Sequence, residues 1–89
     1  MNEPQLQTHQ ELEAIFSSDQ PDMEKLRQGF DLITRSIIDH TQNEVDLARA
    51  MQDAEGVVKL QIKMSTIEHA RSVFDQCYMR ITKRRAWHD

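Results

Sequence analysis

The stretch AMQDAEGVVKLQ, residues 50–61, decides how this chain folds, because helix-forming sequence flanks it on both sides. Asp53 is a favourable helix N-cap, and Glu55 suits the first turn of a helix that starts there. Gly56 would cost about 1 kcal/mol in a helix interior relative to alanine. These residues favour a bend near Asp53. One continuous helix is the alternative, because a cap residue and a glycine together cost only about 1–2 kcal/mol, which packing between chains could offset.

Upstream of this stretch, the sequence predicts a long helix over residues 21–52. Pro21 fits a first helical turn, Ser18 or Asp19 can cap it, and Asp22 suits the positive end of the helix dipole. Apolar residues then recur at spacings of three and four, which places them on one face of a helix. This stripe consists of Met23, Leu26, Phe30, Ile33, Ile37, Thr41, Val45 and Ala48.

Downstream, residues 54–84 predict a second long helix with two apolar faces. The main stripe consists of Val57, Leu60, Met64, Ile67, Ala70, Phe74, Cys77 or Tyr78, and Ile81. A weaker line on the opposite face consists of Val58, Ile62 and Val73. A helix that is apolar on two sides must be covered on two sides. We therefore expect the long helix 21–52 to cover one face and a second copy of the chain to cover the other, in a homo-oligomer centred on this helix.

The predicted fold class is all-α. A chain of 89 residues allows one domain, and its two glycines and two prolines are too few for a protein with many turns. We expect a single domain over residues 1–89, consisting of a weak N-terminal helix in 1–18, the two long helices as a helical hairpin, and a tail over 85–89. The hairpins are expected to assemble as an oligomeric helical bundle or coiled coil.

Charge is distributed unevenly along the chain. The formal net charge is −4, but residues 1–56 hold 4 Lys/Arg and 12 Asp/Glu, whereas residues 57–89 hold 7 and 3. Halves of opposite sign attract each other when they fold antiparallel or when two chains meet, and salt weakens this attraction. The single cysteine excludes an internal disulfide, and no segment approaches the ~20 apolar residues of a transmembrane helix. We expect a cytoplasmic protein.

Residues with catalytic or metal-binding chemistry are few and scattered. His40 and Glu44 share a helix face, but one ligand pair falls short of the three or four that zinc needs. Cys77 lies on the apolar stripe and is expected to pack there as a small hydrophobe. We therefore expect no catalytic residues, no metal and no cofactor. An enzyme that uses His40, Glu44, His69 or Cys77 is the weakest of three functional hypotheses.

The end of the chain, RITKRRAWHD, combines cations with the single tryptophan. Cations at a helix C-terminus complement the helix dipole, which is the simpler interpretation. The alternative is a patch for an anion or an interface, because tryptophan beside cations suits an interface. Its residues would be Arg80, Lys83, Arg84, Arg85 and Trp87. Four cations are few for nucleic-acid binding, and the rest of the chain is acidic, so we expect no nucleic-acid partner.

The segment LARAMQDAEGVVKLQ, residues 47–61, resembles the phasins, small helical proteins that coat polyhydroxyalkanoate granules in bacteria. The similarity lies in a Leu-Ala-x-Ala-apolar helix end, an alanine beside a polar cap, and two apolar residues followed by Leu-Gln. The matching residues are Leu47, Ala48, Ala50, Met51, Ala54, Val57, Val58, Leu60 and Gln61. Weaker similarity extends over about residues 30–81. The resemblance implies amphipathic helices, self-association, no catalysis, a bacterial cytoplasmic setting, and a new helix beginning at Asp53.

The leading hypothesis from the sequence is a phasin-like structural protein that self-associates and coats polyhydroxyalkanoate granules. Its contact residues with a second copy or a hydrophobic surface would be Phe30, Ile33, Ile37, Val58, Leu60, Ile62, Met64, Ile67, Val73 and Phe74. The alternative is a small acidic adaptor or inhibitor that binds one protein partner through the acidic first half, since such a surface can dock on a basic one.

Overall fold

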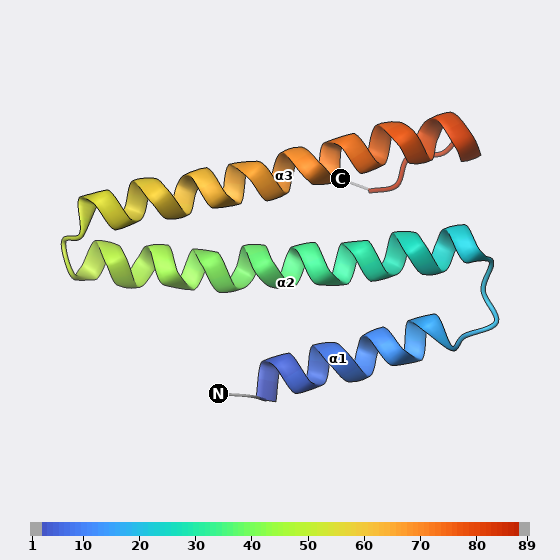
Figure 1. Cartoon of the computed structure of the whole chain (residues 1–89), viewed down its shortest axis with the longest axis horizontal. Helices are drawn as coiled ribbons and strands as arrows, with labels where there is room; N and C mark the ends of the chain where they lie inside the picture. The colour runs from blue at the N-terminus through green and yellow to red at the C-terminus, as the bar shows by residue number, and fades with distance from the viewer. Residues whose placement is uncertain (1–2, 88–89) are drawn as a thin grey trace. The chain divides into compact units, whose positions relative to one another are not determined.

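The computed structural model describes residues 3–87, with side chains from Thr8 onward, as three α-helices (Figure 1). Helix α1 spans Glu3–Phe16, α2 spans Asp22–Ala50 and α3 spans Ala54–Thr82. No strand occurs among residues 3–87, so the all-α prediction is confirmed. The predicted segments 1–18 and 85–89 include residues 1–2 and 88–89, which lie outside the described residues.

The contacts divide the chain into two compact units, Met1–Ser36 and Ile37–Asp89. The boundary falls inside α2. Helix α2 therefore supplies its first half to one helix pair and its second half to another. We call these the N-terminal unit and the C-terminal unit.

The N-terminal unit pairs α1 with the first half of α2 through a close approach at Gly29. A Cβ atom at Gly29 would lie 2.7 Å from Cε1 of Phe16 and 3.8 Å from Cδ2 of Leu12. The missing side chain at Gly29 thus makes room for the Phe16 ring. The Gln20 and Gln28 amides also exchange hydrogen bonds of 3.2 and 2.6 Å between the linker and α2.

Hydrogen bonds in the linker between α1 and α2 correct one sequence-based expectation. The Ser18 hydroxyl donates to the Ile15 carbonyl at 2.7 Å, so it satisfies the end of α1 and does not cap α2. The Pro21 carbonyl accepts from the amides of Glu24 and Lys25 at 3.0 and 3.1 Å. Pro21 therefore stands at the N-cap position of α2, where its missing N–H leaves no donor unsatisfied.

The C-terminal unit is a helical hairpin, in which the second half of α2 and α3 run antiparallel (Figure 1). The predicted bend is confirmed. Gln52 adopts a left-handed conformation, with φ 58°, and its amide donates to the Arg49 carbonyl, while the Asp53 amide donates to the Ala48 carbonyl. This pair of bonds is a Schellman motif, which satisfies the last carbonyls of α2.

Asp53 then starts α3. Its Oδ1 accepts from the Gly56 amide at 3.0 Å, which is the N-cap bond that the sequence predicted. A Cβ atom at Gly56 would clash with the Asp53 carboxylate. The sequence indicated Gly56 as a helix-breaking residue, but in the structure it lies inside the first turn of α3 and leaves room for the cap.

The hairpin packs apolar and small residues of the two helices against each other. Thr41, Val45 and Ala48 of α2 are buried. Leu60, Met64, Ile67 and Phe74 of α3 are half-buried. The inner stripe of α3 is shorter than predicted, because Ile81 is 68% exposed and Cys77 is also exposed. Tyr78, with 3% exposure, takes the inner position, so the expectation that Cys77 packs in the core is wrong.

Candidate functional site

The face of α3 that points away from α2 carries exposed apolar side chains. Val58 is 54% exposed, Ile62 61% and Val73 43%. They share one side of the helix, because positions 58, 62 and 73 fall within about 60° of one another at 100° per residue. We call this set the outer face of α3. The other predicted contact residues of α3 are half-buried and face inward; they are Leu60, Met64, Ile67 and Phe74. The predicted contact residues of α3 therefore lie on two different faces of the helix.

The three predicted contact residues on α2 belong to different units. Phe30 and Ile33 lie in the N-terminal unit, where Phe30 is half-buried and Ile33 is 42% exposed. Ile37 is half-buried and begins the C-terminal unit. Sequence reasoning named Leu47 and Met51 in the phasin-like segment but not among the contact residues, and they are 61% and 70% exposed. Their spacing of four, off the main stripe of α2, is the pattern that indicates a second apolar face.

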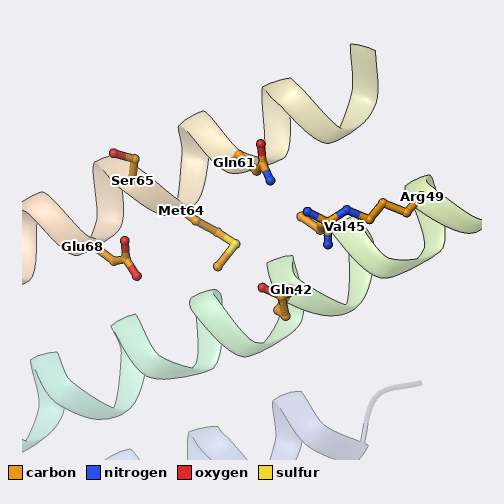
Figure 2. Close-up of a pocket in the computed structure, with 7 residues that line it drawn as sticks. All are labelled: Gln42, Val45, Arg49, Gln61, Met64, Ser65 and Glu68. Carbon is orange, nitrogen blue, oxygen red and sulfur yellow. The ribbon is translucent and has the colours of Figure 1, made fainter. Parts of the chain in front are cut away.

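A polar slot opens along one side of the hairpin, between α2 and α3 (Figure 2). Its volume is about 230 Å³, and its lining consists of Gln42, Val45, Arg49, Gln61, Met64, Ser65 and Glu68. Val45 and Met64 lie at the contact between the helices, and the amide, guanidinium, hydroxyl and carboxylate groups surround them. Gln42 donates to Asp46 at 3.0 Å. The sequence analysis did not predict this slot, although its residues recur at spacings of three and four on both helices.

Two polar atoms in the hairpin have no hydrogen-bond partner among the described residues. They are Oγ1 of Thr41, whose side chain is fully buried, and Oε1 of Glu44. A buried hydroxyl without a partner costs about 1–3 kcal/mol. Neither residue lines the slot.

The C-terminal hook, residues 83–87, folds back along α3 and is held by Asp75. Lys83 ends the helix in a left-handed conformation, with φ 66°, and its amide donates to the Met79 carbonyl. The Ala86 amide donates to Oδ1 of Asp75 at 2.6 Å, and Nε of Arg85 donates to Oδ2 at 2.8 Å. The Asp75 carboxylate is thus occupied through both oxygens, and Ala86 is 1% exposed.

These bonds explain why the pKa of the Asp75 carboxyl is shifted. The hydrogen bond from the Ala86 amide lowers the pKa of the Asp75 carboxyl below its usual 3.8. Burial opposes this effect, and the hydrogen bond and charge of Arg85 add to it. A lowered pKa means that the ionised carboxylate stabilises the folded hook.

Trp87 completes the hook through its ring. The indole stacks on Phe74 with centroids 5.3 Å apart, and Nε1 donates to the Arg71 carbonyl at 2.8 Å. The Arg71 guanidinium lies 4.2 Å from the Trp87 ring centroid, which is cation–π geometry. Tyr78 also stacks on Phe74, with ring centroids 6.1 Å apart.

The five residues of the predicted anion or interface patch therefore have different environments. Arg85 pairs with Asp75, Trp87 stacks on Phe74, and Nη2 of Arg84 donates to the Tyr78 hydroxyl at 3.4 Å. Arg80 and Lys83 are exposed. Sequence reasoning found the cluster of cations but missed Asp75, which orders it, because nothing local links positions 75 and 85.

The residues of the enzyme hypothesis differ in exposure in the described part of the chain. His40, His69 and Cys77 are exposed, and Glu44 is half-buried. Within residues 3–87, no group of three or more His, Cys, Asp or Glu side chains is placed to hold a metal ion. As far as the structure describes them, none of the three helices has the length and hydrophobicity to cross a membrane.

Comparison with known proteins gives no relative: the chain matches no protein-family model, and no curated protein or solved structure is significantly similar to it. The phasin resemblance of residues 47–61 thus remains a prediction. In the structure this segment is the helix end, the Schellman motif, the Asp53 cap and the start of α3.

Proposed function

We propose that this chain is a non-catalytic structural protein that binds an apolar surface through the outer face of α3, in the manner of a phasin on a polyhydroxyalkanoate granule. The observation that carries the proposal is the exposure of Val58, Ile62 and Val73 on one side of a 29-residue helix. The phasin-like pattern over the hairpin bend supports the granule as the surface.

The physical basis is the apolar area that contact would remove from water. Fully burying an aliphatic side chain gains about 1.5–3 kcal/mol. The three side chains are about half exposed, so covering them gains roughly 1 kcal/mol each. Helix α3 is capped at Asp53 and held at its other end by the hook, which presents these side chains on a rigid element.

The test is co-sedimentation with amorphous polyester particles. We expect the wild-type chain to sediment with the particles, and the double variant Ile62→Asp, Val73→Asp to lose at least tenfold in affinity, since charge would have to enter the contact. Gln10→Asp is the control, because Gln10 is exposed and lies on α1, outside the outer face of α3.

Two results would contradict the proposal. One is a wild-type chain that stays in the supernatant at both low and high salt. The other is equal binding by the wild type and the double variant, which would place the contact on another surface.

A further inference from the structure

The C-terminal unit has exposed apolar side chains on two opposite sides. Val45, which is buried, and Met64, which is half-buried, both line the slot between the helices (Figure 2). Leu47 lies two residues from Val45, and Ile62 lies two residues from Met64, which turns each by about 200°. Leu47 therefore points away from α3, and Ile62 points away from α2. With Met51, Leu47 forms what we call the outer face of α2.

The two outer faces carry charges of opposite sign. Asp39, Glu44 and Asp46 border the outer face of α2, and Asp39 and Asp46 are exposed. Arg49, the one cation of this helix segment, lines the slot toward α3 instead. On α3, Lys59, Lys63 and Arg80 are exposed on or beside the outer face. Of the acidic residues, Glu55 lies on that face, and Glu68 lies beside it on the border that lines the slot. Within residues 3–87, no ion pair is recorded for Asp39, Glu44, Asp46, Lys59, Lys63 or Arg80.

We propose that the outer face of α3 binds the outer face of α2 of a second copy of this chain, with Ile62 and Val58 against Leu47 and Met51, and Lys59 and Lys63 against Asp39 and Asp46. Each face supplies apolar side chains that are more than half exposed, flanked by charges that the other face complements. Two copies of the α3 face would place lysines against lysines, so electrostatic complementarity favours the unlike pair.

Such a contact joins unlike surfaces and is therefore heterologous. It leaves one unused face at each end of a pair, so that further copies add until a ring closes or a filament grows. The sequence predicted an oligomer centred on this helix, and the charges that border the two outer faces favour α2 of a neighbouring copy as its cover. The proposal shares with the proposed function the premise that the α3 face binds, but it does not require a granule.

Two variants, each blocked on one face, test the direction of the contact. Ile62→Asp, Val73→Asp blocks the α3 face, and Leu47→Asp, Met51→Asp blocks the α2 face; all four sites are at least 43% exposed, and circular dichroism checks that each variant folds. By light scattering at tens of micromolar, the wild type should exceed a dimer. Each variant alone should be a monomer. Their equimolar mixture should have the mass of a 1:1 dimer, because each variant has kept the face that the other has lost.

Charge reversal tests the electrostatic part. A variant with Lys59→Glu and Lys63→Glu has two acidic faces, and one with Asp39→Lys and Asp46→Lys has two basic faces. Each alone should assemble at least tenfold more weakly than the wild type, and mixing them should restore assembly. Raising the salt concentration should weaken wild-type assembly, since exposed charges are screened.

Three results would overturn the proposal: a monomeric wild type, a variant blocked on the α2 face that assembles like the wild type, or a mixture of the blocked variants that stays monomeric. The second would indicate a symmetric contact between α3 faces. The variant blocked on the α2 face also separates the two proposals, because it should lose assembly and still sediment with polyester particles.

Discussion

The two ends of α3 are fixed in different ways. At its start, every bond is local: Asp53 caps the amide of Gly56, three residues away, and the Schellman bonds close within five residues. At its end, the hook is held by bonds across 10, 11 and 16 residues, to Asp75 and Arg71. A residue with positive φ lies near each end: Gln52 ends α2 just before α3 begins, and Lys83 ends α3. The preceding helix therefore stops in the same backbone conformation at both places.

The difference concerns what each end needs from the rest of the molecule. A local cap forms as soon as its own turn forms, so the start of α3 depends on the sequence around Asp53. The hook forms only when α3 already presents Phe74, Asp75 and Tyr78 along one face. We therefore expect the hook to be the more sensitive end, and the single tryptophan, Trp87, reports on it directly.

The largest expected effect is at Asp75. Asp75→Ala removes the acceptor for the Ala86 amide and Arg85, and hydrogen bonds to a charged group contribute about 1.5–3 kcal/mol. Because Arg85 is largely exposed, its ion pair adds little. We expect the free energy of unfolding in urea to fall by about 2 kcal/mol, with a red shift of Trp87 emission before unfolding.

Asp19→Asn is the control for Asp75→Ala, because Asp19 is exposed and is not recorded in any hydrogen bond or ion pair of the described residues. It should leave both measurements unchanged. An Asp75→Ala protein with wild-type emission would show that Trp87 holds the hook without the carboxylate.

A smaller effect is expected from acid. The pKa of Asp75 is lowered on folding, so its contribution to stability is fully present above the unfolded value of 3.8. It is lost as the pH falls through the lower pKa of the folded state. Trp87 emission should therefore stay constant down to about pH 4 and shift below it. In Asp75→Asn this step should be missing; a shift at the same pH in that variant would assign the titration to another group.

A smaller loss of stability than at Asp75 is expected at the start of α3. Asp53→Ala removes the N-cap bond to Gly56, and such a loss costs about 1 kcal/mol. Urea unfolding measures it, and Trp87 emission of the folded protein should not change, because the hook lies at the other end. Emission that changes with Asp53 would mean that the two ends are coupled.

At the same bend, Gln52→Gly should change the stability of the protein in the opposite direction to Asp53→Ala. Glycine adopts the left-handed conformation without steric cost, so this change should stabilise the protein by a few tenths of a kcal/mol up to about 1 kcal/mol. A destabilised Gln52→Gly variant would contradict the local account of the bend.

The sequence by itself determined the features that depend on near neighbours. The all-α class, the bend at Asp53 and the two faces of α3 follow from propensity, capping and a period of 3.6 residues, which act within a few turns. The exposure of Val58, Ile62 and Val73 agrees with the second of those faces.

Only the tertiary structure decided the features that depend on distant residues. From the sequence, Gly56 only weakened a helix, whereas in the structure Gly29 makes room for Phe16 and Gly56 makes room for the Asp53 carboxylate. The division inside α2 depends on which helix packs on each half. Asp75 became the anchor of the hook because folding brings Arg85 and Ala86 to a carboxylate ten and eleven positions away. Helical periodicity relates residues on one face, but it does not determine where a chain turns back, because that depends on contacts formed only after the helices have packed.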